Sequence, residues 1–314
     1  MTQFIFGNSL KDKLNRWPVV RNTIWKIEAI VLTVLLRILS WLPVAKASSI
    51  GAYLGRALGT RIAKHQMVIT NLSLAFPEKS VPEIEQLAGD VWANGGAVVA
   101  EFANIKKICR SDRLKIAVAG YIEGFNRKDR PVILVTAHFS NWEIAAAAAG
   151  RMVQPLSAPF TPPNNPYLGR MLSAHRQALG VNLLARDVSI RPLFKQIAGG
   201  HSIAFIMDQR VDSGKPVPFM GMDKMTTLVP ARLGLRFNCE IVPVRAERLS
   251  PANYLITFYP PVVADDDDAG EEERALQVTT KINQLFESWI RERPQEWFCA
   301  SRRWPKIRKN KSLS

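Results

Sequence analysis

A histidine and a glutamate five residues apart are the side chains of this sequence best suited to acid–base chemistry. They are His138 and Glu143, the two ends of the stretch HFSNWE. The four apolar residues 132–135 predict a strand buried on both faces, and the Ala-rich residues 144–149 predict a tightly packed helix. His138 is therefore expected in a loop at the carboxyl edge of the strand, where ligands bind in open α/β sheets. Glu143 is expected one turn into the helix.

A base and a carboxylate placed in this way suit proton transfer. His138 would take a proton from a substrate group, Glu143 would orient the imidazole, and free N–H groups at the start of the helix would stabilise an oxyanion. A plainer interpretation is also open. Ser140 would cap the helix, Glu143 would only bond back to the cap as in an S-x-x-E capping box, and His138 would be an ordinary core residue. The spacing alone does not distinguish these interpretations.

A second polar pair stands at the end of another predicted strand. The stretch HSIAFIMDQ, residues 201–209, predicts a buried strand that ends in a polar pair, so Asp208 is expected at the same sheet edge as His138. A loop rich in Pro and Asn, at residues 161–166, leads into a helix that carries Arg176. We expect this loop to pass near the opening of the site.

Predicted strands and helices alternate along most of the chain, which indicates an α/β fold with a central, mostly parallel sheet flanked by helices. Further helices are expected at residues 48–76, 81–104, 111–130 (a helix or helix-turn), 190–198 and 271–293, and further strands at 154–156, 181–186, 239–249 and 254–262. Glycines at positions 51, 55 and 59, spaced by four, predict close helix packing. A capping box at residues 80–83 begins the next helix. The stretch SGKPVPFMG, residues 213–221, predicts a loop with exposed apolar side chains that would suit a lid or a lipid-facing flap.

The most hydrophobic stretch lies near the amino terminus, at residues 24–44. A helix of this length would extend about 30 Å, which is enough to cross the apolar core of a bilayer. Three charged residues interrupt it, so a helix that lies in the membrane surface is equally admissible. A membrane-associated amino-terminal helix is therefore predicted, with its geometry open.

The charge balance favours an anionic partner. The formal net charge is +15 and the isoelectric point about 10.0, although residues 265–274 hold seven acids and one base. Such a surface attracts nucleic acid, anionic lipid or an acidic carrier protein. Nucleic acid is the least favoured, because no zinc-ligand spacing, RNP-like aromatic motif or basic region with heptads is visible. The acidic run is expected to be a solvated loop, and the basic residues 302–311 a solvated tail or a contact with an anionic membrane.

The cysteines indicate reduced thiols. Cys109, Cys239 and Cys299 are far apart and form no C-x-x-C pair. This usage is typical of a cytosolic environment, without a disulfide framework or a metal site. No metal or organic cofactor is expected.

Taken in order, several motifs resemble the late lipid A acyltransferases, the lauroyl/myristoyl acyltransferase family within the lysophospholipid acyltransferase group. These motifs are NLSLAFPEKS, HFSNWE, NNPYLGRMLSAHRQALG, DQRVDSGKPVPFMG, TTLVPARL followed by EIVPV, and PQEWFCASRRW. The resemblance extends from about Trp41 to Trp304, nearly the whole chain. The chain departs from the family at Cys299 and Ser301, where tryptophan and histidine are usual, and this departure leaves the exact acceptor open.

The resemblance implies a reaction and a set of roles. His138 matches the family's catalytic histidine and Glu143 its acidic partner, while Arg176 and Asp208 match positions that we assign to substrate binding and site architecture. The implied reaction is direct transfer of a fatty acyl chain from an acyl-carrier-protein thioester to a hydroxyl of a lipid A precursor of the Kdo-lipid IVA type. Ser140 is a rival nucleophile, but no GxSxG elbow supports an acyl-enzyme.

The implied partners are acyl carrier protein, an anionic lipid acceptor and the inner membrane, with the active site on the cytoplasmic face. The chain then divides into a membrane-anchor segment, residues 1–47, and a catalytic acyltransferase domain with a basic tail, residues 48–314. Two alternatives stay open. One is the same transfer onto a glycolipid, lysophospholipid or aminolipid. The other is a non-enzymatic peripheral membrane protein, which would have no use for polar residues at the ends of two buried strands.

Overall fold

The computed structural model describes residues 17–126, 130–185 and 190–305 of the 314. Its helices are α2 (Pro18–Trp41), α3 (Val44–Gly59), α4 (His65–Ala75), α5 (Val81–Phe102), α6 (Ile105–Cys109), α7 (Glu123–Asn126), α8 (Trp142–Met152), α9 (Pro166–Gln177), α10 (Arg191–Ala198), α11 (Val229–Phe237), α12 (Glu271–Glu292) and the 3₁₀ helix η1 (Pro294–Glu296). Its strands are β1 (Leu114–Val118), β2 (Ile133–Thr136), β3 (Leu156–Phe160), β4 (Val181–Ala185), β5 (Ser202–Ile206), β6 (Lys215–Phe219), β7 (Met222–Thr226), β8 (Ile241–Ser250) and β9 (Asn253–Phe258).

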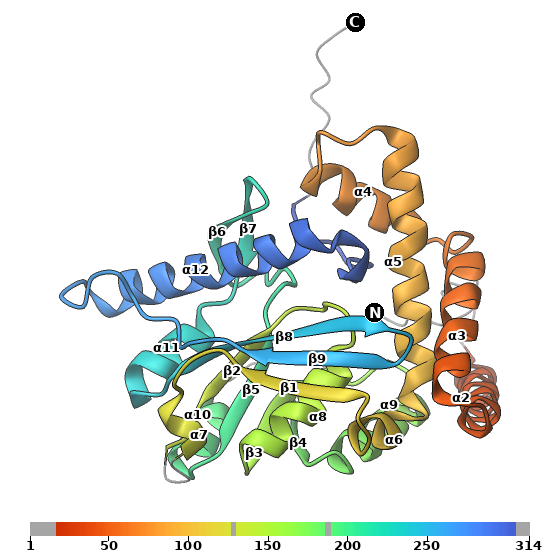
Figure 1. Cartoon of the computed structure of the whole chain (residues 1–314), viewed down its shortest axis with the longest axis horizontal. Helices are drawn as coiled ribbons and strands as arrows, with labels where there is room; N and C mark the ends of the chain where they lie inside the picture. Colours follow the sequence, from red (N-terminus) through yellow and green to blue (C-terminus); the bar gives the residue numbers. More distant parts are fainter. Residues whose placement is uncertain (1–16, 127–129, 186–189, 306–314) are drawn as a thin grey trace, which may run out of the picture.

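Seven of the described strands form one sheet that is the framework of the molecule (Figure 1). Their order is β1-β9-β8-β2-β5-β3-β4, and β6 pairs separately with β7. Neighbouring strands of the large sheet run parallel, except for the antiparallel pair of β8 and β9. The predicted α/β fold with a mostly parallel central sheet is therefore confirmed.

Helices cover both faces of this sheet, with α12 on one side and α6, α8 and α9 on the other in Figure 1. Strand β2 shows how burial of both faces of the sheet determines the sequence of a strand. Ile133 and Val135 belong to an apolar cluster that includes residues of α11 and α12, whereas Leu134 belongs to a second cluster that includes the alanines of α8. A parallel strand covered on both faces has no polar side, so its sequence is an uninterrupted apolar run.

Small residues let α3 pack closely against α5. A Cβ atom on Gly51 or Gly55 would lie 2.4 Å from the nearest atom of α5, so only glycine fits at these contacts. The packing role predicted for these glycines is confirmed, as is the capping box that Ser80 and Glu83 form at the start of α5. The helix predicted at residues 48–76 is divided into α3 and α4.

The prediction of a helix or helix-turn at residues 111–130 is wrong. This segment contains strand β1, followed by the short helix α7. β1 pairs in parallel with β9 at the edge of the sheet. An edge strand is only partly covered, so it lacks the apolar run that identifies buried strands in a sequence.

The prediction that residues 213–221 form a loop with exposed apolar side chains is also wrong. The segment contains strand β6, which forms an antiparallel ribbon with β7. Val217 and Phe219 are 0% exposed and belong to the same apolar cluster as residues of α12. The two prolines of this strand are tolerated because each strand of a two-stranded ribbon has a free edge.

The predicted hydrophobic stretch forms most of α2. Within residues 17–126, 130–185 and 190–305, no helix is both long enough and apolar enough to cross a membrane. Association of α2 with a membrane stays a prediction, as does the division of the chain at residue 47. Part of the predicted anchor, residues 1–16, and most of the predicted basic tail, residues 306–314, lie outside the described residues.

Candidate active site

The register of β2 and β5 brings His138 and Asp208 together. The strands are parallel with Thr136 opposite Ile206, and each polar residue follows that pair at the same distance along its chain. Nδ1 of His138 lies 2.7 Å from Oδ1 of Asp208, and the backbone N–H of His138 donates to the same oxygen over 3.0 Å. The prediction that both residues lie at one carboxyl edge of the sheet is confirmed.

Asp208 is a buried carboxylate surrounded by donors. Its Oδ2 accepts hydrogen bonds from Trp297 Nε1 at 3.1 Å and from Arg303 Nη2 at 2.7 Å. Burial by itself would raise the pKa of this carboxyl group, but Arg303, and after it His138, hold the pKa of Asp208 well below its usual value. Its side chain is 0% exposed. Asp208 therefore belongs to the architecture of the site, because its carboxylate fixes the imidazole of His138. Its role in substrate binding stays a prediction.

The partner of Glu143 is Arg176. Nε of Arg176 donates to Oε2 of Glu143 at 2.9 Å, and Nη2 donates to Oε1. Burial acts to lower the pKa of Arg176, but the hydrogen bonds and charge of Glu143 outweigh it and raise that pKa. Glu143 therefore does not orient the imidazole as expected, because the hydrogen-bond partner of His138 Nδ1 is Asp208. Glu143 orients a cation.

The cap of α8 is Asn141 and not Ser140. Oδ1 of Asn141 accepts hydrogen bonds from the N–H groups of Glu143 and Ile144, both at 3.2 Å, and its Nδ2 donates to the buried Glu101 at 2.8 Å. Ser140 has a φ angle of 51°, in the left-handed region, whereas cap residues are usually extended. The capping box predicted for Ser140 is therefore not formed. Two of the N–H groups that we expected to stabilise an oxyanion, those of Glu143 and Ile144, are therefore already engaged by Asn141.

The segment that follows α12 holds the histidine loop in place. Phe139 and Trp297 form an antiparallel bridge, and the N–H of Phe298 donates to the carbonyl of His138 over 2.8 Å. Trp297 and Arg303, which contact Asp208, belong to the same segment. Sequence reasoning includes both in the motif PQEWFCASRRW but assigns them no role. An arginine beside an aromatic residue is a weak signal, and no local pattern places it against Asp208.

A buried lysine lies behind this carboxylate. Lys224 is 0% exposed, its Nζ donates to the backbone oxygen of Asp208 over 3.2 Å, and it lies 4.0 Å from the centre of the Phe219 ring. Burial lowers the pKa of Lys224 to about 7. Sequence reasoning misses this residue, because a lone lysine in a short strand predicts an exposed side chain.

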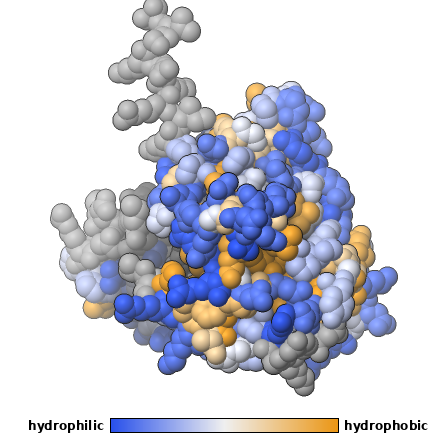
Figure 2. Space-filling view, turned by 90° about the vertical axis from the view of Figure 1, so that its left-hand side faces the viewer, coloured by the Kyte–Doolittle hydropathy of each residue, from blue (hydrophilic) through white to orange (hydrophobic). Residues whose placement is uncertain are grey.

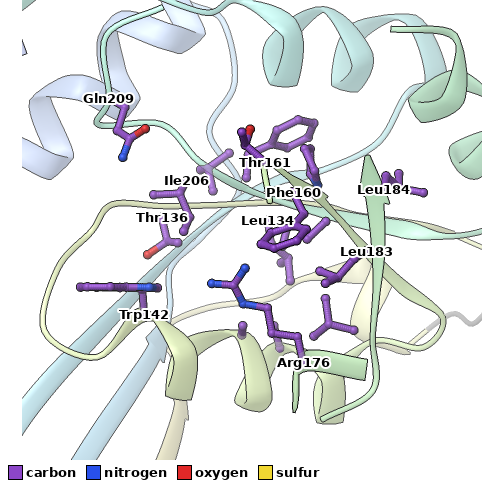
Figure 3. A pocket seen from close by; sticks show the side chains of 18 of the residues that line it. Leu134, Thr136, Trp142, Phe160, Thr161, Arg176, Leu183, Leu184, Ile206 and Gln209 are labelled. Atoms are coloured by element: carbon purple, nitrogen blue, oxygen red, sulfur yellow. The ribbon is translucent and has the colours of Figure 1, made fainter. Parts of the chain in front are cut away.

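A cavity of about 600 Å³ opens beside His138 (Figure 3). Its apolar lining includes Leu134, Ala149, Phe160, Leu183, Leu184 and Ile206. Arg176 points into the cavity between Trp142 and Phe160, and its guanidinium carbon lies 5.2 Å from the centre of the Phe160 ring. Gln209 also lines it, with Nε2 at 3.3 Å from Nε2 of His138. Such a space suits a long apolar chain whose reactive end meets a few polar groups.

The site therefore combines a base, His138, a cation, Arg176, and the apolar lining of the cavity. Among the residues that the structure describes, no group of three or more His, Cys, Asp or Glu side chains could hold a metal ion. Proton removal from a hydroxyl, next to an anion-stabilising arginine and a long apolar chain, is the chemistry that this set of groups can perform.

Comparison with known proteins points to the same chemistry. Residues 18–306 match the family of bacterial lipid A biosynthesis acyltransferases. The chain is 26% identical over 263 residues to the lipid A biosynthesis myristoyltransferase of Escherichia coli K12, and 25% identical over 262 residues to lipid A biosynthesis acyltransferase 1 of Shigella flexneri. Each of these alignments covers 78% of this chain and 77% of the relative. The lipid A biosynthesis acyltransferase of Haemophilus influenzae is 21% identical over 290 residues, covering 90% of this chain and 88% of its own length.

Proposed function

We propose that this chain transfers a fatty acyl chain from an acyl-carrier-protein thioester to a hydroxyl group of a lipid A precursor of the Kdo-lipid IVA type. The premise is that the chain belongs to the bacterial lipid A biosynthesis acyltransferase family and is therefore an acyltransferase. The observation that carries the proposal is the setting of His138. Its Nδ1 is held by a buried carboxylate, and its ring lines an apolar cavity large enough for an acyl chain.

His138 acts as the general base. Because Nδ1–H donates to Asp208, the free lone pair of the neutral imidazole is on Nε2. Nε2 now meets the amide of Gln209 at 3.3 Å, a contact that the acceptor hydroxyl replaces. As Nε2 removes the proton, the hydroxyl oxygen bonds to the carbonyl carbon of the thioester.

The tetrahedral intermediate then collapses. Its carbon–sulfur bond breaks, and the imidazolium returns the proton to the departing sulfur, so the products are an ester on the lipid and a free thiol on the carrier. The ionised Asp208 stabilises the imidazolium of His138 between these two proton transfers. The reaction needs no acyl-enzyme, and Ser140, which is 0% exposed, has no place in it.

Arg176 stabilises the negative charge that develops on the carbonyl oxygen. Two of its nitrogens donate to Glu143, which keeps the guanidinium pointed into the cavity (Figure 3). A cation that is already oriented needs no rearrangement when charge develops in the transition state. Glu143 is thus a positioning residue that acts through Arg176, and Arg176 takes the role first expected of the helix N–H groups.

The proposal also assigns a site to the acyl donor and a membrane to the protein. The acyl chain of the donor occupies the 600 Å³ cavity. The net charge of +15 favours an acidic carrier protein and an anionic lipid acceptor. Apolar side chains exposed along α2, such as Ile30 and Val34, support attachment to the inner membrane with the active site on its cytoplasmic face.

Mass spectrometry of the product tests this function. The full-length protein in detergent micelles would be given a Kdo-bearing tetra-acylated lipid A precursor and acyl-carrier-protein thioesters of several chain lengths. We expect the precursor to gain the mass of one acyl group. A precursor whose acyl chains lack hydroxyl groups should gain nothing, because the nucleophile is missing.

Absence of any gain with folded protein and intact precursor would refute the proposed acceptor. Transfer onto a glycolipid, lysophospholipid or aminolipid in the same assay would replace the acceptor and keep the reaction.

A further inference from the structure

A second cavity meets the first at the catalytic histidine. It has a volume of about 450 Å³ and lies between α2, α5, α9 and the carboxyl-terminal segment. The residues that line both cavities include His138, Trp142, Arg176 and Gln209. Those that line only the second include Leu32, Leu36, Lys64, Phe102, Met171 and Phe298. The lining is mostly apolar, so this cavity also suits an acyl chain.

Helix α2 is the wall of this cavity and has apolar side chains on both faces. Leu32 and Leu36 are half-buried and line the cavity. Val34, Leu35 and Ile38 are exposed to 51%, 50% and 47%.

Apolar side chains are also exposed on the neighbouring helix α3, where Tyr53 is 73% and Leu58 60% exposed. By contrast, hydrophilic residues dominate the side of the molecule seen in Figure 2, which lies away from α2 and α3. Exposed apolar side chains gathered on one side of a protein are typical of contact with a membrane or a partner. The second cavity therefore lies directly behind the surface best suited to a bilayer.

We infer that this second cavity receives the hydroxyacyl chain of the lipid acceptor, which passes from the membrane along the inner face of α2 to His138, while the donor chain fills the first cavity. The inference rests on the proposed function and assigns its two substrates to two sites. Trp142, which lines both cavities, has its ring centre 5.2 Å from that of His138 and 5.7 Å from that of Phe298. Two chains that arrive from the two cavities would meet beside the imidazole.

The physical state of each substrate supports this assignment. The acceptor carries several acyl chains that stay in the bilayer, and each CH₂ group drawn into water costs about 0.8 kcal/mol. A cavity behind the membrane-facing helix admits one chain without exposing it to water. The donor arrives from water on a soluble carrier, so its site needs no membrane wall. Lys64, which lines the second cavity, also suits an anionic acceptor.

Tryptophan substitutions on the two faces of α2 test the inference. Leu36→Trp fills the cavity, and Leu35→Trp, its matched control, adds the same side chain on the exposed face. In detergent micelles we expect Leu36→Trp to raise the KM for the lipid precursor about tenfold or more and to leave the KM for the acyl-carrier-protein thioester unchanged. Leu35→Trp should leave both within about twofold of the wild type.

A substitution in the first cavity provides the reciprocal test. Leu183→Trp should shift the preference of the enzyme toward shorter donor chains and leave the KM for the precursor unchanged. Leu32→Trp repeats the test of the second cavity if Leu36→Trp lowers the thermal unfolding midpoint.

An unchanged precursor KM in folded Leu36→Trp, or a raised donor KM in its place, would overturn the inference while leaving the proposed function intact. A wild-type protein that transfers no acyl group to the precursor would refute the proposed function, and the inference with it.

Discussion

Replacement of Asp208 by asparagine distinguishes the roles of the two carboxylates at the site, Asp208 and Glu143. Asparagine has nearly the same shape but no charge, and it can present an N–H group to Nδ1 of His138. The imidazole would then carry its proton on Nε2 and could not act as the base. We expect the transfer rate to fall by about 10² to 10⁴, the usual contribution of a positioned base, which corresponds to about 3 to 5 kcal/mol of activation free energy.

The same substitution has a cost in stability that a second substitution can remove. Arg303 is 0% exposed, and Asp208→Asn leaves its charge without a partner, so the free energy of unfolding should fall by about 3 to 5 kcal/mol. Adding Arg303→Met removes the unpaired charge. The double variant should regain most of the stability and none of the activity. Thermal unfolding in detergent and single-turnover acyl transfer measure the two effects independently.

Glu143→Gln is the matched control. The glutamine oxygen can still accept one of the two hydrogen bonds from Arg176, so transfer should fall less than in Asp208→Asn. A folded Asp208→Asn protein with near wild-type transfer would refute the reasoning. So would a larger loss in Glu143→Gln, because it would make Glu143 the carboxylate that supports the base.

Three further predictions concern stability. The pKa of Lys224 is about 7 in the folded protein and about 10.5 in an unfolded chain, so the unfolded state binds more protons between these values. Wild-type stability should therefore rise from pH 7 to 10, by at most about 1.4 kcal/mol per pH unit, and Lys224→Met should show no such rise in denaturant unfolding. Gly51→Ala should lower the free energy of unfolding by about 1 to 3 kcal/mol, because its Cβ would lie 2.4 Å from an α5 side chain. Gly270→Ala, with no atom within 4 Å of its Cβ, should lower it far less. Equal shifts in the unfolding midpoint would contradict the packing argument. Asn141→Ala should cost about 0.5 to 2 kcal/mol through loss of the α8 cap, more than Ser140→Ala, and the reverse order would make Ser140 the cap.

Local sequence pattern is sufficient for the elements that carry the site. An apolar run before His138 and another before Asp208 predict two buried strands, and the structure pairs them in parallel. Helix α9, which carries Arg176, is likewise predicted by the loop before it and the glycine after it, because these turn signals are local. These patterns correctly place His138 and Asp208 at one edge of the sheet and Arg176 on a helix that follows a loop near the site.

Contacts between distant segments are what local pattern misses. The choice between Glu143 and Asp208 as partner of the imidazole depends on the register of β5 and on a loop held by the carboxyl-terminal segment. Arg303 reaches Asp208 from the far end of the chain, and no periodicity encodes that contact. Local pattern also fails to predict the ribbon of β6 and β7, because its prolines indicate a loop unless the pairing partner is known.

The decisive measurement is the single-turnover rate of acyl transfer by His138→Asn. The asparagine side chain can still donate a hydrogen bond to Asp208, which preserves the fold, but it has no nitrogen that can take up a proton. We predict an unfolding midpoint close to that of the wild type and a transfer rate lower by about 10² or more. A folded His138→Asn protein that acylates the precursor at the wild-type rate would contradict the assignment of His138 as the base.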